Sequence, residues 1–407
     1  MKLLLSVTVL LAFLAAYFIY TPLPPTVSEP WKLMLLDATL RTIVKVNDVA
    51  HTLGLSNHVD VLNYAFGNLG APETKSSEDV QVSDTAFAGV QVLVFQSTLK
   101  SEGKKRGVVY VHGGGWALGT TRRGFYNLLG RQMAKDLDAV IVSVEYRLVP
   151  NVRFPVPYED VLLATKHFLQ PEVLARYKVD PDRVGISGDS AGGNLAAAVA
   201  QQISIDDSVS VKFKVQALLY PVLQALDFNT PSYQQNQYMP ILHRKVMVQF
   251  WLEYLGTNPS HLQAMLVNNH TALDVTQVEA VRAKVDWTAL LPATLQKQHK
   301  PVVQVHGSSK ILEELPALLD TRAAPLLAER DVLARLPQAY ILTCEHDVLR
   351  DDGLMYGKRL QDAGVAVEQD HYEDGFHGCI FFTSWPMYSS VGLRALENYI
   401  TWLQKNL

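Results

Sequence analysis

The amino-acid sequence predicts an α/β protein, with a mostly parallel central sheet and helices on both faces of that sheet. From residue 80 onward, short apolar segments alternate with segments whose apolar residues recur at helical spacing. Several of the short segments are apolar throughout, which is typical of parallel strands covered on both faces. The chain has 407 residues, of which 48% are hydrophobic, and this is enough for a large core.

The strands and helices of this sheet are expected in regular order. The strands are rich in β-branched and other apolar residues, whereas the helices have apolar residues three and four positions apart. The expected strands are 89–96, which belongs to an outer hairpin, then 107–112, 139–146, 183–188, 215–221, 339–344 and 365–372. The expected helices are 123–136, 157–169, 190–203, 352–363 and 391–405.

The regular alternation stops at residues 224–335, where prolines, aromatic residues and long apolar stretches are scattered. We interpret this region as a largely helical insert. Helical spacing also recurs at 31–66, before the sheet begins. The predicted parts are a signal-anchor transmembrane helix at 1–22, a helical segment that contributes to a cap at 23–78, the first part of the core at 79–223, the insert at 224–335 and the second part of the core at 336–407.

The N-terminal segment 3–20 contains no charged residue. As a helix it would be about 27 Å long, close to the thickness of an endoplasmic reticulum bilayer. Cleaved signal peptides have a shorter apolar core followed by small residues, whereas Tyr17, Phe18 and Tyr20 resemble an interfacial aromatic belt. We therefore predict an uncleaved membrane anchor, with a cleaved signal peptide or a buried core helix as the alternatives. Lys2 favours a cytoplasmic N-terminus and a lumenal body.

The composition narrows the class of protein further. The net charge is −4, and no basic excess points to nucleic acid. Two cysteines, Cys344 and Cys379, are too few for a disulfide framework, which leaves one bridge or two free thiols. Asn269 begins an N-glycosylation sequon, which agrees with a lumenal body, whereas the sequon at Asn258 is disqualified by its proline. We predict no metal site and no cofactor.

Ser190 lies in the sequence GDSAG, where an apolar strand ends and an alanine-rich helix begins. Almost no loop is left between the two elements, so the turn is sharp and the serine backbone is expected to be strained. Gly188 and Gly192 remove the Cβ atoms that would clash in such a turn. The start of a helix also favours developing negative charge. We therefore predict that Ser190 is a nucleophile, the alternative being a tight turn that happens to contain serine.

A serine hydroxyl needs a base, and in turns of this kind the acid and the base follow in the order Ser…Asp…His. Asp347 lies in the loop after the strand 339–344 and is the predicted acid. Glu345 is also near, while Asp351 and Asp352 open the next helix, where capping explains them better. His346 lies in the same loop.

Two histidines, His371 and His377, lie in the right order to be the base. His371 still belongs to the alternating pattern of a strand, which favours a structural role. His377 lies in the glycine-flanked sequence EDGFHG, which can turn the imidazole back toward Ser190. We predict that His377 takes the proton of Ser190 while Asp347 orients its ring.

The sequence HGGGW at 112–116 follows another strand and is expected at the same edge of the sheet. Consecutive glycines leave backbone N–H groups able to bind the oxyanion of an acyl-transfer intermediate. We predict an oxyanion hole formed by His112, Gly113, Gly114 and Ala191, in which the amides of the last three are the donors. The alternative is a flexible glycine turn.

These motifs resemble the α/β-hydrolase fold and, more narrowly, the hormone-sensitive lipase group. The stretches CEHDVLRDDGLMYGKRL, EDGFHG and EYRLVP are similar to the arylacetamide deacetylase branch of that group. The resemblance implies a microsomal, single-pass serine esterase with a lumenal catalytic domain and with neutral lipid esters as substrates, among them cholesteryl esters and 2-acetyl monoalkylglycerol ethers. It assigns nucleophile, acid and base to Ser190, Asp347 and His377, and a glycan to Asn269.

Other functions stay open on the sequence alone. The same three residues would serve amide hydrolysis, as in the deacetylase relatives, and some proteins of this fold are binding modules that have lost their catalytic residues. We expect a lipophilic ester and the lipid bilayer as partners and the endoplasmic reticulum membrane as the location, with the cell membrane as the alternative. The sequence does not decide the oligomeric state.

Overall fold

A computed structural model describes residues 2–55, 75–99, 103–122, 124–271, 280–304, 306–383 and 388–407. Within these residues a single sheet has eight strands in the order β1-β2-β4-β3-β5-β6-β7-β8. The strands are β1 (Val80–Phe87), β2 (Val90–Ser97), β3 (Lys105–Val111), β4 (Ala139–Val144), β5 (Val179–Asp189), β6 (Val215–Leu219), β7 (Gln338–His346) and β8 (Val367–Phe376). The predicted α/β class with its mostly parallel sheet is confirmed.

The direction of the strands brings the predicted site residues to one edge of the sheet. β1 and β2 form an antiparallel hairpin, and β2 is also antiparallel to β4. From β4 to β8, all neighbouring strands are parallel. The carboxyl ends of these strands therefore meet at a common edge, where sites of α/β proteins form.

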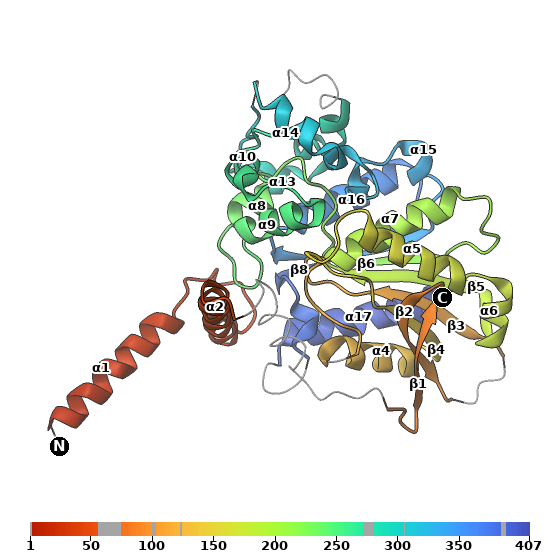
Figure 1. The fold of residues 1–407 in the computed structure, drawn as a ribbon, viewed down its shortest axis with the longest axis horizontal. Helices are drawn as coiled ribbons and strands as arrows, with labels where there is room; N and C mark the ends of the chain where they lie inside the picture. Colours follow the sequence, from red (N-terminus) through yellow and green to blue (C-terminus); the bar gives the residue numbers. More distant parts are fainter. Residues whose placement is uncertain are drawn as a thin grey trace.

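Helices cover both faces of the sheet (Figure 1). Alternate residues of β3 explain this, since Val109 and Val111 are buried on one face, and Val108 and Tyr110 on the other. α4 (Gly124–Asp136) and α17 (Ser390–Asn406) pack on the second of these faces, and α5 (Val156–Phe168), α6 (Pro171–Arg176), α7 (Ala191–Ile205) and α16 (Arg350–Asp362) on the first.

The predicted insert consists of short helices. The longest helix described in the insert, α9, buries Met247, Val248, Trp251, Leu252 and Tyr254 in the protein core. The α-helices here are α8 (Pro231–Gln235), α9 (Arg244–Leu255), α10 (Leu262–Leu266), α12 (Trp287–Leu290), α13 (Ala293–Gln296), α14 (Ser309–Glu314) and α15 (Arg330–Leu333). The 3₁₀ helices are η1 (Pro259–His261), η2 (Ala283–Val285), η3 (Pro316–Leu319) and η4 (Pro325–Leu327), while η5 (Cys379–Phe381) follows β8.

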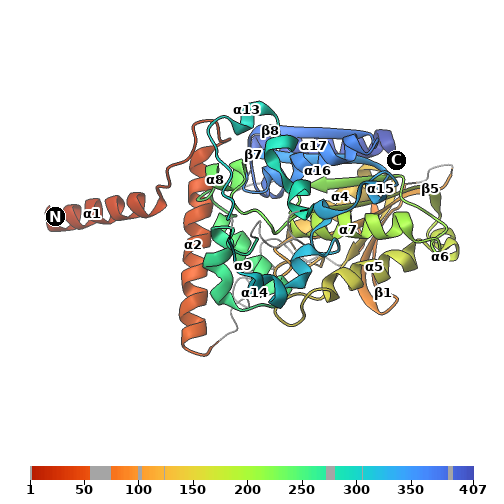
Figure 2. The same cartoon turned by 90° about the horizontal axis from the view of Figure 1, so that it is seen from above.

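Two helices precede the sheet. α1 (Lys2–Ile19) projects away from the rest of the protein, and α2 (Pro30–Thr52) lies against the body (Figures 1 and 2). The segment predicted to be a transmembrane helix at 1–22 contains α1, but in the described part of the chain no helix is both long and apolar enough to cross a membrane. Within the predicted segment 23–78, residues 56–74 lie outside the described residues.

Candidate active site

Ser190 lies in a sharp turn between β5 and α7. Its backbone angles are φ 52° and ψ −120°, a conformation that non-glycine residues rarely adopt and that costs about 1–3 kcal/mol. The turn can close because a Cβ at Gly188 would lie 2.4 Å from the carbonyl oxygen of Gly192, and one at Gly192 would lie 2.1 Å from that of Val111. The amide of Ser190 donates to the carbonyl oxygen of Leu219 at 2.9 Å, so the strained turn is held against β6.

Sheet register brings the predicted acid and base side by side. His346 and Phe376 are paired at the ends of β7 and β8, so the next residues, Asp347 and His377, leave the sheet together. His377 Nδ1 is 2.7 Å from Asp347 Oδ2, and His377 Nε2 is 3.0 Å from Ser190 Oγ. The three predicted residues therefore form a continuous hydrogen-bonded chain.

Neighbouring groups hold the hydrogen-bonded side chains of Asp347, His377 and Ser190 in one arrangement. Asp347 is 1% exposed, and its Oδ1 accepts from the amide of Leu349 at 2.9 Å. An ionised Asp347 makes Nδ1 of His377 the donor, which leaves Nε2 as an acceptor for the Ser190 hydroxyl. The ring of Tyr220 packs on the imidazole of His377 edge to face, at 4.9 Å between centroids. Such a geometry permits proton transfer from serine to histidine.

The loop of the HGGGW sequence follows β3 and lies beside Ser190, but one predicted donor is already engaged. The Gly113 amide donates to Asp189 Oδ1 and to Tyr126 Oη, each at 3.0 Å. This differs from the expectation that the amide is free, because the side chain of Asp189 turns toward the loop. No hydrogen bond donated by the Gly114 amide is found among the described residues. The Ala191 amide is at the first position of α7, where helices leave N–H groups unpaired.

His112 shapes this loop from inside the protein. Its Nδ1 donates to the carbonyl oxygen of Gly113 at 2.8 Å, its ring stacks on Tyr146, and the Tyr146 hydroxyl donates to the His112 carbonyl oxygen. Burial lowers the pKa of His112, which favours the neutral ring. Trp116, at the end of the same loop, is fully buried and stacks on Tyr254 of the insert, so it packs the loop against α9.

Asp189 is a site residue that the sequence analysis missed. Its carboxylate is buried and accepts hydrogen bonds from Tyr110 at 2.9 Å and from Tyr126 at 3.1 Å, in addition to that from Gly113. Burial raises the pKa of Asp189 to about 6, despite these donors. Because Asp189 directly precedes Ser190, its bond to the Gly113 amide ties the glycine loop to the turn that holds the nucleophile. A carboxylate at the end of an otherwise buried strand was the signal that could have identified it.

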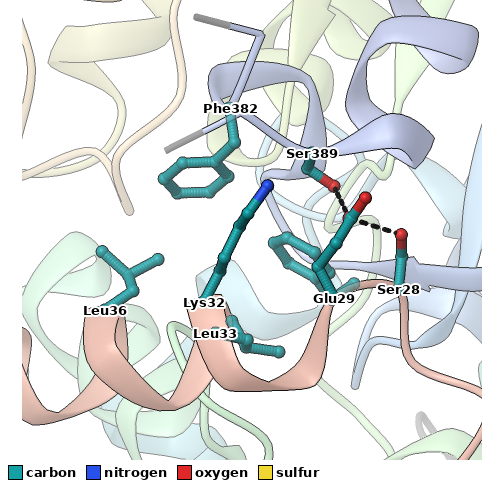
Figure 3. A pocket seen from close by; sticks show the side chains of 8 residues that line it. Ser28, Glu29, Lys32, Leu33, Leu36, Phe382 and Ser389 are labelled. Atoms are coloured by element: carbon teal, nitrogen blue, oxygen red, sulfur yellow. Dashed lines mark hydrogen bonds between the residues drawn. The ribbon is translucent and has the colours of Figure 1, made fainter. Parts of the chain in front are cut away.

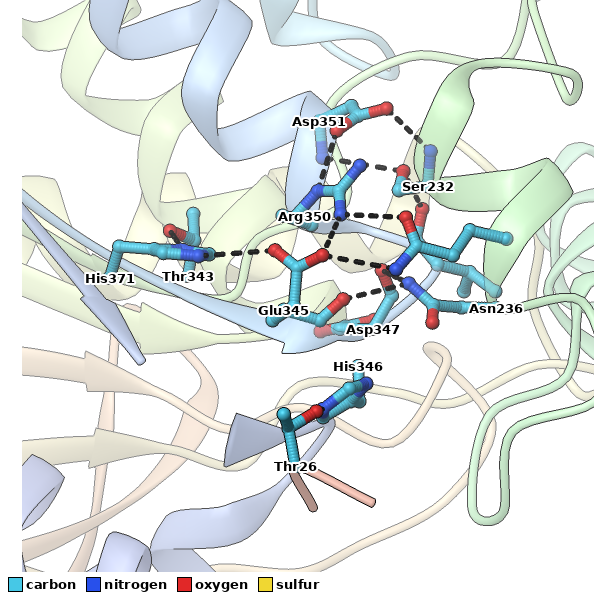
Figure 4. A network of polar contacts seen from close by, with 12 residues as sticks. Thr26, Ser232, Asn236, Thr343, Glu345, His346, Asp347, Arg350, Asp351 and His371 are labelled. Atoms are coloured by element: carbon cyan, nitrogen blue, oxygen red, sulfur yellow. Dashed lines mark hydrogen bonds and ion pairs between the residues drawn. The ribbon is translucent and has the colours of Figure 1, made fainter. Parts of the chain in front are cut away.

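A polar network joins the loop of Asp347 to the insert (Figure 4). The side chain of Asn236 donates to the carbonyl oxygens of Glu345 and Asp347 at 2.9 and 3.0 Å. The fully buried guanidinium of Arg350 contacts Glu345 at 2.7 Å and Asp351 at 2.9 Å. Asn236 and the network around it carry no local sequence signal, because the insert meets this loop only in the folded protein.

The capping interpretation of Asp351 and Asp352 is wrong. Both are fully buried, and neither caps α16, whose N-cap residue is Leu349. Asp351 accepts from the Ser232 amide at 2.6 Å, and Asp352 accepts from the Leu223 amide at 2.9 Å. The two carboxylates therefore bind the backbone just before and just after the start of the insert at residue 224. A pattern of neighbouring residues in the sequence does not reveal such contacts.

The remaining histidines of this region face away from Ser190. His371 lies between Thr343, at 2.9 Å, and Glu345, at 3.3 Å. Burial acts to raise the pKa of Glu345, but hydrogen bonding to His371 and the charge of Arg350 outweigh it and bring that pKa to about 2. His346 Nε2 is 2.9 Å from the hydroxyl of Thr26, which lies between α1 and α2.

The two cysteines come together next to the site. Cys344 lies on β7 and Cys379 follows β8, and their Sγ atoms are 3.8 Å apart. Both are fully buried and both are free thiols. Of the two alternatives left by the sequence, one bridge or two free thiols, this structure has two free thiols, although they lie close together.

The mostly parallel sheet, the strained serine turn and the adjoining histidine and aspartate define a protein of the α/β-hydrolase class. The chain belongs to the α/β hydrolase family, since the family model described as alpha/beta hydrolase fold matches residues 108–288 and 309–381. It is 59% identical over 401 residues to neutral cholesterol ester hydrolase 1 of Bos taurus, with 98% of each chain covered. It is 45% identical over 398 residues to arylacetamide deacetylase of Bos taurus, again with 98% of each chain covered.

A solved structure agrees on the fold. The thermostable esterase from Pseudomonas putida ECU1011 superimposes with a TM-score of 0.66 at 23% identity, covering 95% of this chain and 99% of that chain. This likeness concerns the fold alone, and it is the curated relatives that identify the chain as a carboxylic ester hydrolase. The predicted enzyme class and the predicted resemblance are confirmed.

Proposed function

We propose that this enzyme hydrolyses esters of neutral lipids, cholesteryl esters and 2-acetyl monoalkylglycerol ethers among them, with Ser190 as the nucleophile. The observation that carries the chemistry is the chain of contacts from Asp347 through His377 to Ser190, at 2.7 and 3.0 Å. The observation that supports a cholesteryl ester as substrate is the similarity to neutral cholesterol ester hydrolase 1 over nearly the full chain.

In the first half of the reaction, Ser190 Oγ attacks the ester carbonyl carbon as His377 Nε2 takes the hydroxyl proton. The tetrahedral intermediate collapses when His377 returns that proton to the leaving alcohol, and the acyl group stays on Ser190. A water molecule then gives a proton to His377 and attacks the acyl carbon. The second tetrahedral intermediate collapses as His377 gives that proton to Ser190 Oγ, which releases the carboxylic acid and restores the serine hydroxyl. Asp347 stabilises the imidazolium that forms in each half.

The oxyanion of both intermediates is bound by the amides of Gly114 and Ala191 in this proposal. The Ala191 amide directly follows Ser190 at the start of α7, and the Gly114 amide lies in the glycine loop after β3, the neighbour of β5 in the sheet. One such donor contributes about 3 kcal/mol to transition-state stabilisation. The loop is held in place by two bonds: the His112 ring donates to the carbonyl oxygen of Gly113, and the Gly113 amide donates to Asp189.

A substrate panel tests the proposed function. We expect cholesteryl oleate and a 2-acetyl monoalkylglycerol ether to be hydrolysed in one detergent system, with kcat/KM at least about tenfold above that for an aryl acetamide. Enzyme inactivated with a fluorophosphonate serves as the blank. A higher kcat/KM for the aryl acetamide than for the two lipid esters would favour amide hydrolysis. This is a second candidate function, which the 45% identity to arylacetamide deacetylase supports.

We further propose that the protein is attached to the endoplasmic reticulum membrane as a single-pass type II protein, with residues 1–22 in the lipid and the catalytic body in the lumen. The support is the uncharged segment 3–20 and the large exposed apolar side chains along α1, such as Leu10, Phe13 and Tyr17. The cell membrane is the alternative location.

The sequon provides the test of this location. Asn269 is half-buried and Thr271 is fully buried, so a glycan has to be attached before the insert folds. We expect endoglycosidase H to increase the electrophoretic mobility of the wild type and of the control Asn258→Gln, but not that of Asn269→Gln. A wild type that is insensitive to the glycosidase, together with digestion of its body by protease in intact microsomes, would show a cytoplasmic body.

A further inference from the structure

We propose that α2 lies in the membrane interface and holds one side of the catalytic body against the lipid surface. The contact is made by Trp31, Leu35, Val46, Val49 and Leu53, which we call the α2 stripe. This inference rests on the proposed attachment through α1 and goes beyond it, because it assigns a second lipid-binding element and an orientation to the body.

The α2 stripe follows one side of the helix. Its members are spaced by four, eleven, three and four residues, which at 3.6 residues per turn keeps them within a narrow arc. They are 41–66% exposed. Large apolar side chains that share one exposed face are unusual on a protein surface and mark an interaction site.

On the opposite side, the N-terminal part of α2 is bound to the body (Figure 3), whereas Val44 further along that side is exposed. Leu33 and Leu36 line a small pocket together with Phe376 and Phe382. At the N-terminal end of the helix, the Glu29 carboxylate accepts hydrogen bonds from the hydroxyls of Ser28 and Ser389. It also accepts one from the backbone amide of Ser390, the first residue of α17. The helix is therefore fixed, and the α2 stripe points away from the core.

The position of α1 indicates what covers the α2 stripe. Phe18 of α1 shares an apolar hollow with Thr42, Lys45, Val46 and Val49, so α1 leaves α2 on the side of the stripe. The two helices lie crosswise (Figure 2). If α1 enters lipid, the surface of that lipid lies along the α2 stripe.

Polar contacts fix the direction in which α1 leaves. Arg41 donates to the carbonyl oxygen of Phe18 at 2.8 Å and to Asp37 at 2.9 Å, and the Thr21 hydroxyl donates to Asp37 at 2.8 Å. These bonds join the end of α1, the connecting segment and the middle of α2. The angle between the helices is therefore set by the fold.

A lipid surface fits this arrangement better than a protein partner. α1 exposes large apolar side chains all along its length, which is typical of a helix surrounded by lipid. Beside the stripe, exposed Lys45 lines the apolar hollow with its ammonium nitrogen 5.5 Å from the centroid of the Phe18 ring, and at a lipid surface this charge would meet phosphate groups. Leu33 and Phe376 line the same pocket, and Phe376 directly precedes His377, so the lipid-bound side of the body would be the side of the base.

Site-directed spin labelling tests the proposal on the full chain. Cys344 and Cys379 are fully buried, so a nitroxide reacts selectively at an introduced exposed cysteine. The test variants are Leu35→Cys and Val49→Cys, and the control is Leu128→Cys on α4, where the leucine is 56% exposed. The protein is reconstituted in phosphatidylcholine vesicles containing phosphatidylserine.

We expect the ratio of oxygen to nickel-chelate collision rates to be about tenfold higher for the labels at 35 and 49 than for the label at 128. Equal ratios at the three positions would overturn the proposal. Flotation of the vesicles reports separately on attachment through α1, and hydrolysis of a water-soluble ester reports separately on the proposed chemistry. Protein that does not float with the vesicles would also overturn it.

A second comparison measures the consequence for activity. The stripe variant carries Leu35→Ser, Val46→Ser and Val49→Ser, and the matched control carries Leu128→Ser, Leu163→Ser and Ile205→Ser, all at exposed positions. We expect the ratio of activity on a vesicle-borne cholesteryl ester to activity on a soluble ester to fall about tenfold in the stripe variant only. An equal ratio in both variants would contradict the proposal.

Discussion

Replacing Ser190 with alanine is expected to lower kcat for ester hydrolysis by about 10⁶-fold. The hydroxyl that forms the acyl-enzyme is removed, and neither His377 nor the oxyanion donors can replace it. Because the strained backbone at this position belongs to the turn and not to the hydroxyl, the fold should be retained. The measurement is single-turnover hydrolysis of a soluble ester, with thermal unfolding to confirm the fold.

A serine on the same helix provides the control for this variant. Ser204 donates to the carbonyl oxygen of Gln201 at 2.7 Å and lies at the other end of α7. Ser204→Ala should keep wild-type activity and react with a fluorophosphonate as the wild type does. Labelling of Ser190→Ala by the same probe, or a loss of activity of only a few fold, would show that another residue is the nucleophile.

Replacing Asp347 with asparagine is expected to lower kcat by about 10⁴-fold with little change in KM. The amide preserves the shape of the side chain, so the bond from the Leu349 amide can persist. The amide nitrogen, however, donates to Nδ1 of His377, which places the proton on Nε2 and removes the acceptor that Ser190 needs. The imidazolium also loses its counter-charge.

The control for this variant is Asp362→Asn, since Asp362 is exposed and pairs only with Lys358 of its own helix among the ion pairs of the described residues. It should behave as the wild type. A loss that appears in KM while kcat is unchanged would indicate that Asp347 contributes to binding and not to proton transfer. Full activity of Asp347→Asn would assign the acid role to another carboxylate.

The sequence predicted the positions of Ser190, Asp347 and His377 because each depends on local features. The glycines around Ser190 identify a turn that other residues could not make. The other two residues directly follow strands, and parallel strands bring their carboxyl ends to one edge of the sheet. Sequence order and strand ends were therefore sufficient to select His377 over His371.

Other features of the site depend on contacts between distant segments. Asp189 engages the amide of Gly113, and this could not be inferred while the direction of its side chain was unknown. Asp351 and Asp352 satisfied a capping pattern at the start of α16, yet their carboxylates bind backbone amides at the edges of the insert. A buried carboxylate takes whichever donors surround it, and the sequence does not say which these are.

By itself, the sequence determined the α/β class and the approximate positions of seven of the eight described strands, because periodicity and turn chemistry act over a few neighbouring residues. The expected carboxyl ends of these strands differ from the observed ones by one to four residues. Only the tertiary structure decided which amide of the glycine loop is engaged, how Asn236 reaches the loop of Asp347, and which side of α2 is left uncovered. The physical reason is that burial and hydrogen-bond pairing are properties of packed surfaces, and those surfaces bring together residues far apart in the chain.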